Sequence, residues 1–118
     1  MTTPIDQSGF TEEERAKQLE RIDFDQAVIV ENVGPGSTGP LLHVSGETRC
    51  LNMHVWLSAV RYIQRPDYWI IYVNGMLNAE YCLEAIKPFN VLMSPIPLGH
   101  KGIMVVGETK SLRIDYPS

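Results

Sequence analysis

From Gln26 onward the chain consists of short segments rich in branched and aromatic residues, separated by Gly, Pro, Asn and Asp. The segments are AVIVENV, LLHVS, CLNMHVWLS, DYWIIYV, FNVLM, GIMVV and SLRIDY. Short segments of this composition at close intervals are typical of antiparallel strands rather than of alternating strands and helices. We therefore expect a mainly β protein, an antiparallel β-sandwich of about seven strands.

Two of these stretches are nearly the same. LHVSGETRCLNMHV (42–55) aligns without gaps on IMVVGETKSLRIDY (103–116). Turn chemistry alone restricts the letters that a turn can use, so whether the similarity is a duplication stays open.

Each stretch predicts a hairpin that turns at its Glu-Thr pair. Because side chains alternate between the two faces of a strand, this turn places Val44 opposite Leu51 and Val105 opposite Leu112. The next pairs outward are Leu42 with Met53 and Ile103 with Ile114. Both hairpins then present apolar residues to a shared core.

The N-terminal part predicts a helix. Thr11 and Glu14 form a capping-box pattern, and acidic residues fill the first turn. We expect a flexible arm at 1–10 and a single domain over 11–118 that begins with a helix at about 11–22. Residues 78–86 fit a short helix and a strand equally well.

The order Cys50, Trp56 or Trp69, Cys82 resembles the Cys-Trp-Cys order of an immunoglobulin core. The separation is short, and the predicted register places Cys50 on the outer face. We therefore use "immunoglobulin-like" for the architecture only.

Net charge and cysteine content limit the classes of function. A net charge of −4 with scattered basic residues argues against nonspecific nucleic-acid binding and against docking on anionic membranes. The N-terminal sequence lacks the basic and apolar regions of a secretory signal, so we expect a cytoplasmic protein. Free thiols at Cys50 and Cys82 fit that compartment, and a single disulfide is the open alternative.

A metal site would need His43, Cys50 and His54, which the predicted register places on one outer face. Cys50 and His54 are about 13 Å apart along an extended strand, and His100 could complete the set only through an unproven fold. Tetrahedral zinc takes three or four ligands. Polar residues on a half-exposed sheet face are the simpler interpretation, and we expect no cofactor.

Aromatic and arginine residues gather in the middle third of the chain. We expect an interface that uses Arg61, Tyr62, Arg65, Tyr68 and Tyr72, because Tyr, Trp and Arg dominate binding hot spots. By alternation, Trp69 belongs to the core.

Two functions follow as hypotheses. The first is a non-enzymatic protein-binding or assembly module that uses the aromatic and arginine surface, with a protein partner or by self-association as a homo-oligomer. The alternative is a small enzyme, or a ligand- or metal-binding β-barrel, whose site is assembled from His43, His54, His100 and Glu84. Sequence spacing does not exclude it, because catalytic groups meet in space.

Overall fold

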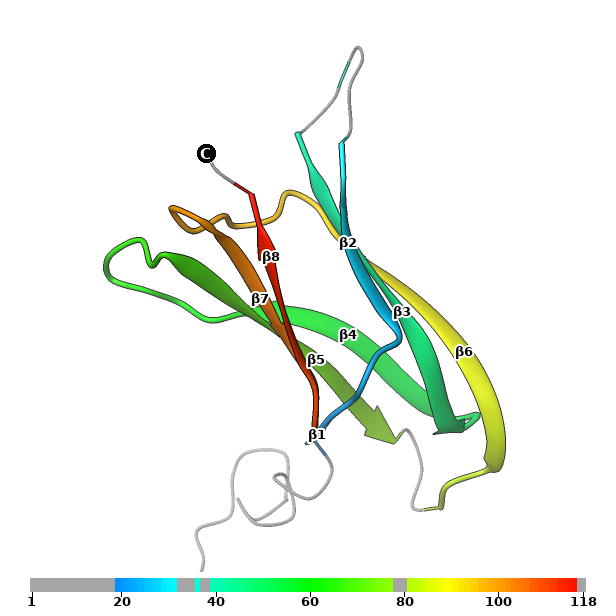
Figure 1. The fold of residues 1–118 in the computed structure, drawn as a ribbon. Coiled ribbons are helices and arrows are strands. Elements are labelled where there is room, and N and C mark those ends of the chain that lie inside the picture. The colour runs from blue at the N-terminus through cyan, green and yellow to red at the C-terminus, as the bar shows by residue number, and fades with distance from the viewer. Residues whose placement is uncertain (1–18, 32–35, 37–38, 78–80, 117–118) are drawn as a thin grey trace, which may run out of the picture.

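The computed structural model describes residues 19–31, 36, 39–77 and 81–116. All of the regular secondary structure in these ranges is β-strand (Figure 1). The strands are β1 (Leu19–Arg21), β2 (Gln26–Val30), β3 (Leu41–Cys50), β4 (Met53–Ala59), β5 (Tyr68–Leu77), β6 (Glu84–Met93), β7 (Gly102–Val106) and β8 (Ser111–Asp115).

Five strands form one sheet around β5. β4 pairs with one edge of β5, while β7 and β1 share the other edge end to end, and β8 continues the sheet beyond β7. The second sheet has the order β2-β3-β6. All pairs are antiparallel except β5 with β7, whose connection runs through β6 in the other sheet. The predicted mainly β, two-sheet class is therefore supported, with eight strands in the described part.

The core lies between the two sheets. Inward side chains of the five-stranded sheet meet those of the three-stranded sheet, as the two-residue period of a strand requires. The buried residues of this cluster are Phe24, Ala27, Leu42, Val44, Ile71, Val73, Phe89, Ile96, Ile103 and Val105. Trp69 packs against the cluster, which confirms its predicted place.

Residues 22–25, which we call the crossing segment, connect the two sheets. The amide of Ile22 donates to the carbonyl of Val73 at 2.9 Å, and the amide of Asp25 donates to the carbonyl of Ser45 at 2.8 Å. Between them Phe24 is only 3% exposed. In Figure 1 this segment passes from β1 to β2 between the sheets. It therefore belongs to the core although it has no regular secondary structure.

The predicted hairpin over 103–116 is confirmed. β7 and β8 pair in the expected register, with Val105 opposite Leu112 and Ile103 opposite Ile114. The amide of Gly107 donates to the carbonyl of Lys110, which closes the turn at 2.8 Å. Leu112 is at the edge of the sheet and is 37% exposed.

The predicted hairpin over 42–55 is wrong. β3 runs through Glu47 and Thr48, which lie opposite Pro88 and Lys87 of β6, and the chain turns only at 51–52. A third strand thus extends β3 past the expected turn. Leu51 is 49% exposed, and β4 then leaves for the five-stranded sheet.

The N-terminal helix predicted over 11–22 finds no support in the described residues. Residues 19–21 form β1, which pairs with β5, and Ile22 begins the crossing segment. Residues 11–18 and the arm at 1–10 lie outside the described residues. In the ambiguous stretch 78–86, residues 84–86 belong to strand β6.

Cys50 and Cys82 form a disulfide, so the interpretation as two free thiols is wrong. Cys50 ends β3, and Cys82 lies just before β6, which pairs with β3. The bridge therefore fastens one end of the three-stranded sheet. No helix among the described residues has the length and apolar character needed to cross a membrane.

Candidate protein-binding surface

The outer side of the five-stranded sheet carries a row of large side chains that we call the aromatic face. Ile71, Val73 and Val105 point into the core, so the residues that alternate with them point outward. The outward residues are His54, Trp56 and Ser58 of β4; Tyr68, Ile70, Tyr72 and Asn74 of β5; Met104 of β7; and Arg21 and Arg113 of β1 and β8.

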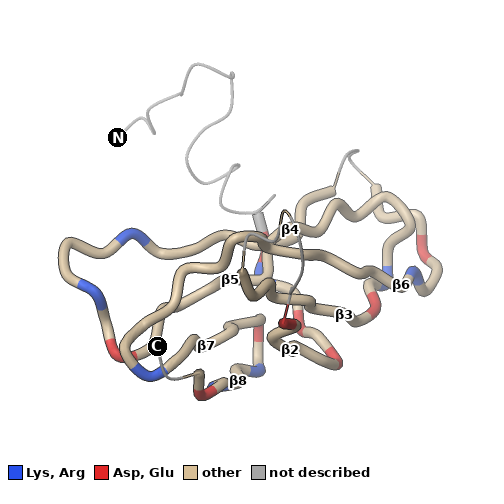
Figure 2. The backbone as a smooth tube through the Cα atoms, turned by 90° about the horizontal axis from the view of Figure 1, so that it is seen from above, with Lys and Arg blue, Asp and Glu red and all other residues tan. Residues whose placement is uncertain are grey.

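Strands β4, β5 and β7 contain no charged residue. Figure 2 shows these strands as uncharged backbone, with charged residues in the adjoining loops and strands. Charges on the aromatic face therefore come from its borders, β1 and β8. An apolar centre with polar edges is the usual anatomy of a protein interface.

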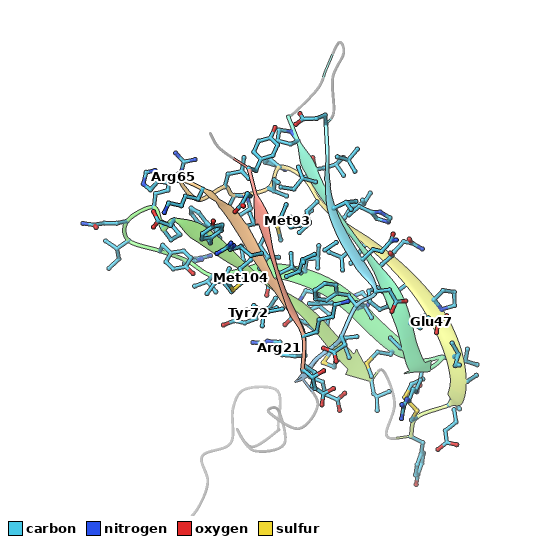
Figure 3. The ribbon with its side chains drawn as sticks, in the orientation of Figure 1. Arg21, Glu47, Arg65, Tyr72, Met93 and Met104 are labelled. Carbon is cyan, nitrogen blue, oxygen red and sulfur yellow. A yellow bond between two sulfur atoms is a disulfide. The ribbon has the colours of Figure 1, made fainter. Side chains whose placement is uncertain are left out.

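Two arginines lie over tyrosine rings. The Arg21 guanidinium carbon is 4.0 Å from the centroid of the Tyr72 ring, and that of Arg113 is 5.2 Å from the centroid of Tyr68. Figure 3 shows Arg21, Tyr72 and Met104 on the side of the sheet that faces away from β2, β3 and β6. Stacking of this kind holds a long, flexible side chain in place on the surface.

Arg21 is fixed further by a hydrogen-bond chain. Its Nη1 donates to Oδ1 of Asn74 at 2.8 Å, and Nδ2 of Asn74 donates to Oγ of Ser58 at 2.8 Å. Asn74 is only 3% exposed, so both of its amide atoms need partners. The chain crosses β1, β5 and β4 and fixes the position of the Arg21 guanidinium on this face.

Tyr68 is anchored to the other border. Its hydroxyl donates to Oδ1 of Asp115 at 2.6 Å. That hydrogen bond raises the pKa of Tyr68 above its ordinary value of 10.0. Arg113 lies 3.8 Å from the same carboxylate oxygen. One carboxylate thus orients both a tyrosine and an arginine.

His54 and Trp56 form the third aromatic group. Their rings stack with centroids 5.3 Å apart and an interplanar angle of 21°. Trp56 lies directly opposite Asn74 across the β4–β5 pair. The stack therefore extends the aromatic face to the β4 edge.

The structure brings together only part of the predicted interface. Tyr68 and Tyr72 share the aromatic face. The Tyr62 ring instead packs edge-on against Trp69, with the two ring centroids 5.3 Å apart. Arg65 donates from Nε to the carbonyl of Leu98 at 2.8 Å, which ties its loop to the β6–β7 connection. Arg61 is exposed in the β4–β5 loop.

The predicted metal ligands do not converge. Cys50 is in the disulfide, and His43 lies in the three-stranded sheet opposite Leu92, within 3.0 Å of Asn90. His54 lies in the five-stranded sheet. Among the described residues, no group of three or more His, Cys, Asp or Glu is arranged to hold a metal ion.

The residues of the enzyme alternative are similarly dispersed. His43 and His54 belong to different sheets. Glu84 begins β6, and His100 follows the far end of that ten-residue strand. Ten residues of strand span about 30 Å. Four such groups do not form one catalytic constellation.

An acidic hollow of about 430 Å³ lies near one end of the crossing segment. Its carboxylates are Glu20, Asp23, Glu47 and Glu108. Asp23 is already engaged there: it accepts hydrogen bonds from the Thr109 hydroxyl, the Thr109 amide and the Lys110 amide. These bonds, led by the Thr109 hydroxyl, lower the pKa of Asp23. Asp23 thus has a structural role in holding the β7–β8 turn.

Of the aromatic face, the predicted interface contained only Tyr68 and Tyr72. Among the residues that sequence reasoning missed are Arg21, Trp56, Met104 and Arg113. Arg21 fell inside the predicted helix, and the two strands that flank β5 could not be identified from the sequence. The only available signal was the alternation of side chains between the two faces of β4 and of β8. That alternation indicates which residues point outward, but it does not indicate which strands are neighbours in the sheet.

Comparison of the chain with protein-family models, with curated proteins and with solved structures found no match.

Proposed function

We propose that this chain is a non-enzymatic protein-binding module whose partner docks on the aromatic face. The observation that carries the proposal is the pair of arginines stacked on Tyr72 and Tyr68. Aromatic, Met and Arg residues are enriched in interfaces, and residues already held in place lose less entropy on binding.

Charge favours a partner with an acidic rim around an apolar centre. Arg113 has a side chain that is 61% exposed, so its guanidinium can meet a carboxylate. Arg21 offers a second cation from β1, which lies on the same edge of β5 as β7 and β8 but farther along the strand. Ile70 and Met104, which pair across β5 and β7, supply the apolar centre. Self-association of this chain through the aromatic face is the other form of the proposal.

Photo-crosslinking tests the proposal. A photo-crosslinking amino acid replaces Met104 on the aromatic face or, as the control, Leu92, which is 63% exposed in the other sheet. We expect a protein adduct from position 104 that Arg113→Glu abolishes and Arg49→Glu leaves intact. Sedimentation of the same variants shows whether the adduct is a second copy. Adducts from position 92 alone, or from neither position, contradict the proposal.

The disulfide is the observation that bears on the compartment. Such bonds persist mainly in oxidising compartments. We therefore infer an oxidising environment for the folded protein, in place of the cytoplasm expected from the sequence.

The immunoglobulin-like architecture and the N-terminal helix stay predictions. The disulfide lies within the three-stranded sheet, whereas an immunoglobulin bridge joins the two sheets. A small enzyme or a ligand- or metal-binding barrel stays the second hypothesis, although two of its residues, His43 and His54, lie in different sheets.

A further inference from the structure

The disulfide lies in an open hollow. Both half-cystines line a space of about 590 Å³ at the end of the three-stranded sheet. The other lining residues are Arg49, Glu84, Ala85 and Ile86. A small thiol fits in a space of this size, so a reagent can approach the bond without unfolding the chain.

The two sulfur atoms differ in access. Cys50 is 9% exposed at the end of β3, whereas Cys82 is half-buried in the connection before β6. An incoming thiolate must approach the sulfur that it attacks. Access therefore favours attack on the Sγ of Cys82, with the sulfur of Cys50 as the leaving group.

We propose that Cys50–Cys82 is a thiol–disulfide exchange site whose substrate is a dithiol reductant. One thiolate of the reductant attacks Sγ of Cys82. The S–S bond breaks, a mixed disulfide forms, and Cys50 leaves as a thiolate that takes up a proton. The second thiolate of the reductant then attacks the reductant's other sulfur, which is bound to Cys82, and Cys82 leaves as a thiolate that also takes up a proton. The protein gains two electrons and two protons, and the dithiol becomes a disulfide.

The segment that carries Cys82 stays attached after reduction. The side chain of Asn52 donates to the carbonyl of Tyr81 at 2.7 Å and accepts from the amide of Leu83 at 3.1 Å. The amide of Leu51 also donates to the carbonyl of Leu83 at 2.9 Å. Three hydrogen bonds hold this connection independently of the sulfur atoms, so exchange is a local event in the folded protein.

Two opposite charges line the hollow and should select among thiols. Arg49 attracts an anionic thiolate, and Glu84 repels it. Both side chains are exposed, so the effect is moderate and falls with salt. Reversing one charge should change the glutathione-to-cysteamine rate ratio by about three- to tenfold, because exposed charges that are screened by water and salt interact only weakly with an approaching thiol.

The test measures reduction of the native full chain by glutathione, which is anionic, and by cysteamine, which is cationic. Acid quenching, alkylation and mass spectrometry give the rates and the site of the first adduct. We expect rates proportional to thiol concentration and a mixed disulfide at Cys82. Arg49→Glu should lower the glutathione-to-cysteamine rate ratio, and Glu84→Lys should raise it. Dithiothreitol should then complete the reduction.

Three results would overturn the proposal. The first is a rate that is independent of thiol concentration and rises with urea as unfolding does, which means that only the unfolded chain reacts. The second is a first adduct at Cys50. The third is a rate ratio that is the same in both charge variants as in the unmodified chain.

Discussion

The stretches 42–55 and 103–116 share the letters Gly-Glu-Thr, yet they serve different structures. In the second copy these residues make the turn between β7 and β8. In the first copy they lie inside β3, opposite β6. The difference shows that a third strand, rather than the turn letters, decides whether such a stretch bends.

The two glycines nevertheless share one role. A Cβ on Gly46 would lie 3.0 Å from the Cα of Phe24, and a Cβ on Gly107 would lie 2.8 Å from the carbonyl oxygen of Ile22. Both therefore make room for the crossing segment. The repeated glycine is therefore needed in both stretches because another backbone segment packs closely against it, and it forms part of a turn only in the second stretch.

The largest difference in stability effect between the two stretches should come from mutating Cys50, which aligns with Ser111 in the second stretch. Replacing both cysteines by serine should lower the free energy of unfolding by about 3–4 kcal/mol, because the bridge closes a loop with a sequence separation of 32. Urea denaturation measures it. Ser111→Ala, at an exposed position, should change stability by less than about 0.5 kcal/mol. Equal effects at both positions would contradict this contrast.

Substitutions of the two aligned glycines should have the next largest effect on stability. Gly46→Ala and Gly107→Ala should each cost about 1–3 kcal/mol of stability through overpacking. Phe89→Leu should recover part of the loss in Gly46→Ala, because the ring atom Cζ of Phe89 is the nearest contact at 2.9 Å. Asp23→Ala should not recover Gly107→Ala, since the Ile22 carbonyl remains. Thermal unfolding of the single and double variants checks both, and rescue at Gly107 would refute the backbone explanation.

Asp23 should make stability depend on pH through the second stretch only, because its carboxylate accepts hydrogen bonds from Thr109 and Lys110 of that stretch. Asp23→Asn should lower stability by about 1–2 kcal/mol at pH 7, through weaker hydrogen bonds to Thr109 and Lys110. The folded pKa of Asp23 lies below its ordinary value of 3.8. The carboxylate's contribution is therefore complete above that value and is lost as the pH falls through the folded pKa. Urea titrations at pH 7, 4 and 2.5 should show the two proteins converging, and a constant difference would exclude this role.

The smallest contrast lies at the aligned cations Arg49 and Lys110. The ammonium of Lys110 donates to the carbonyl of Phe24 at 2.8 Å, whereas Arg49 is exposed at the rim of a hollow. Lys110→Gln should cost about 1 kcal/mol, and Arg49→Gln less than about 0.5 kcal/mol. Chemical denaturation of both variants in parallel is sufficient, and the reverse order would show that Lys110 is not anchored.

Alternation along the strands predicted the class of fold and the second hairpin. It also predicted the burial of Leu42, Val44, Ile103 and Val105. This succeeded because residues two apart on a strand share a face whichever strand lies beside them. It failed for the first hairpin, since the partner of Glu47 and Thr48 comes from β6, about 40 residues later. Pairing between distant strands leaves no local mark in the sequence.

The candidate site was less predictable. Tyr68 and Tyr72 were predicted because Tyr, Trp and Arg dominate binding hot spots, whereas the arginines that stack on them lie on β1 and β8. The disulfide stayed open because the separation of two cysteines in sequence does not give their separation in space.

The crossing segment has a consequence for protein engineering. Surface loops are the usual places for insertions and grafted peptides. Residues 22–25 would be counted as such a loop by sequence, yet their backbone bonds to both sheets and Phe24 is buried. A library that diversifies this stretch should yield mostly aggregated protein, whereas the β4–β5 loop around the fully exposed Ile63 should accept foreign sequence.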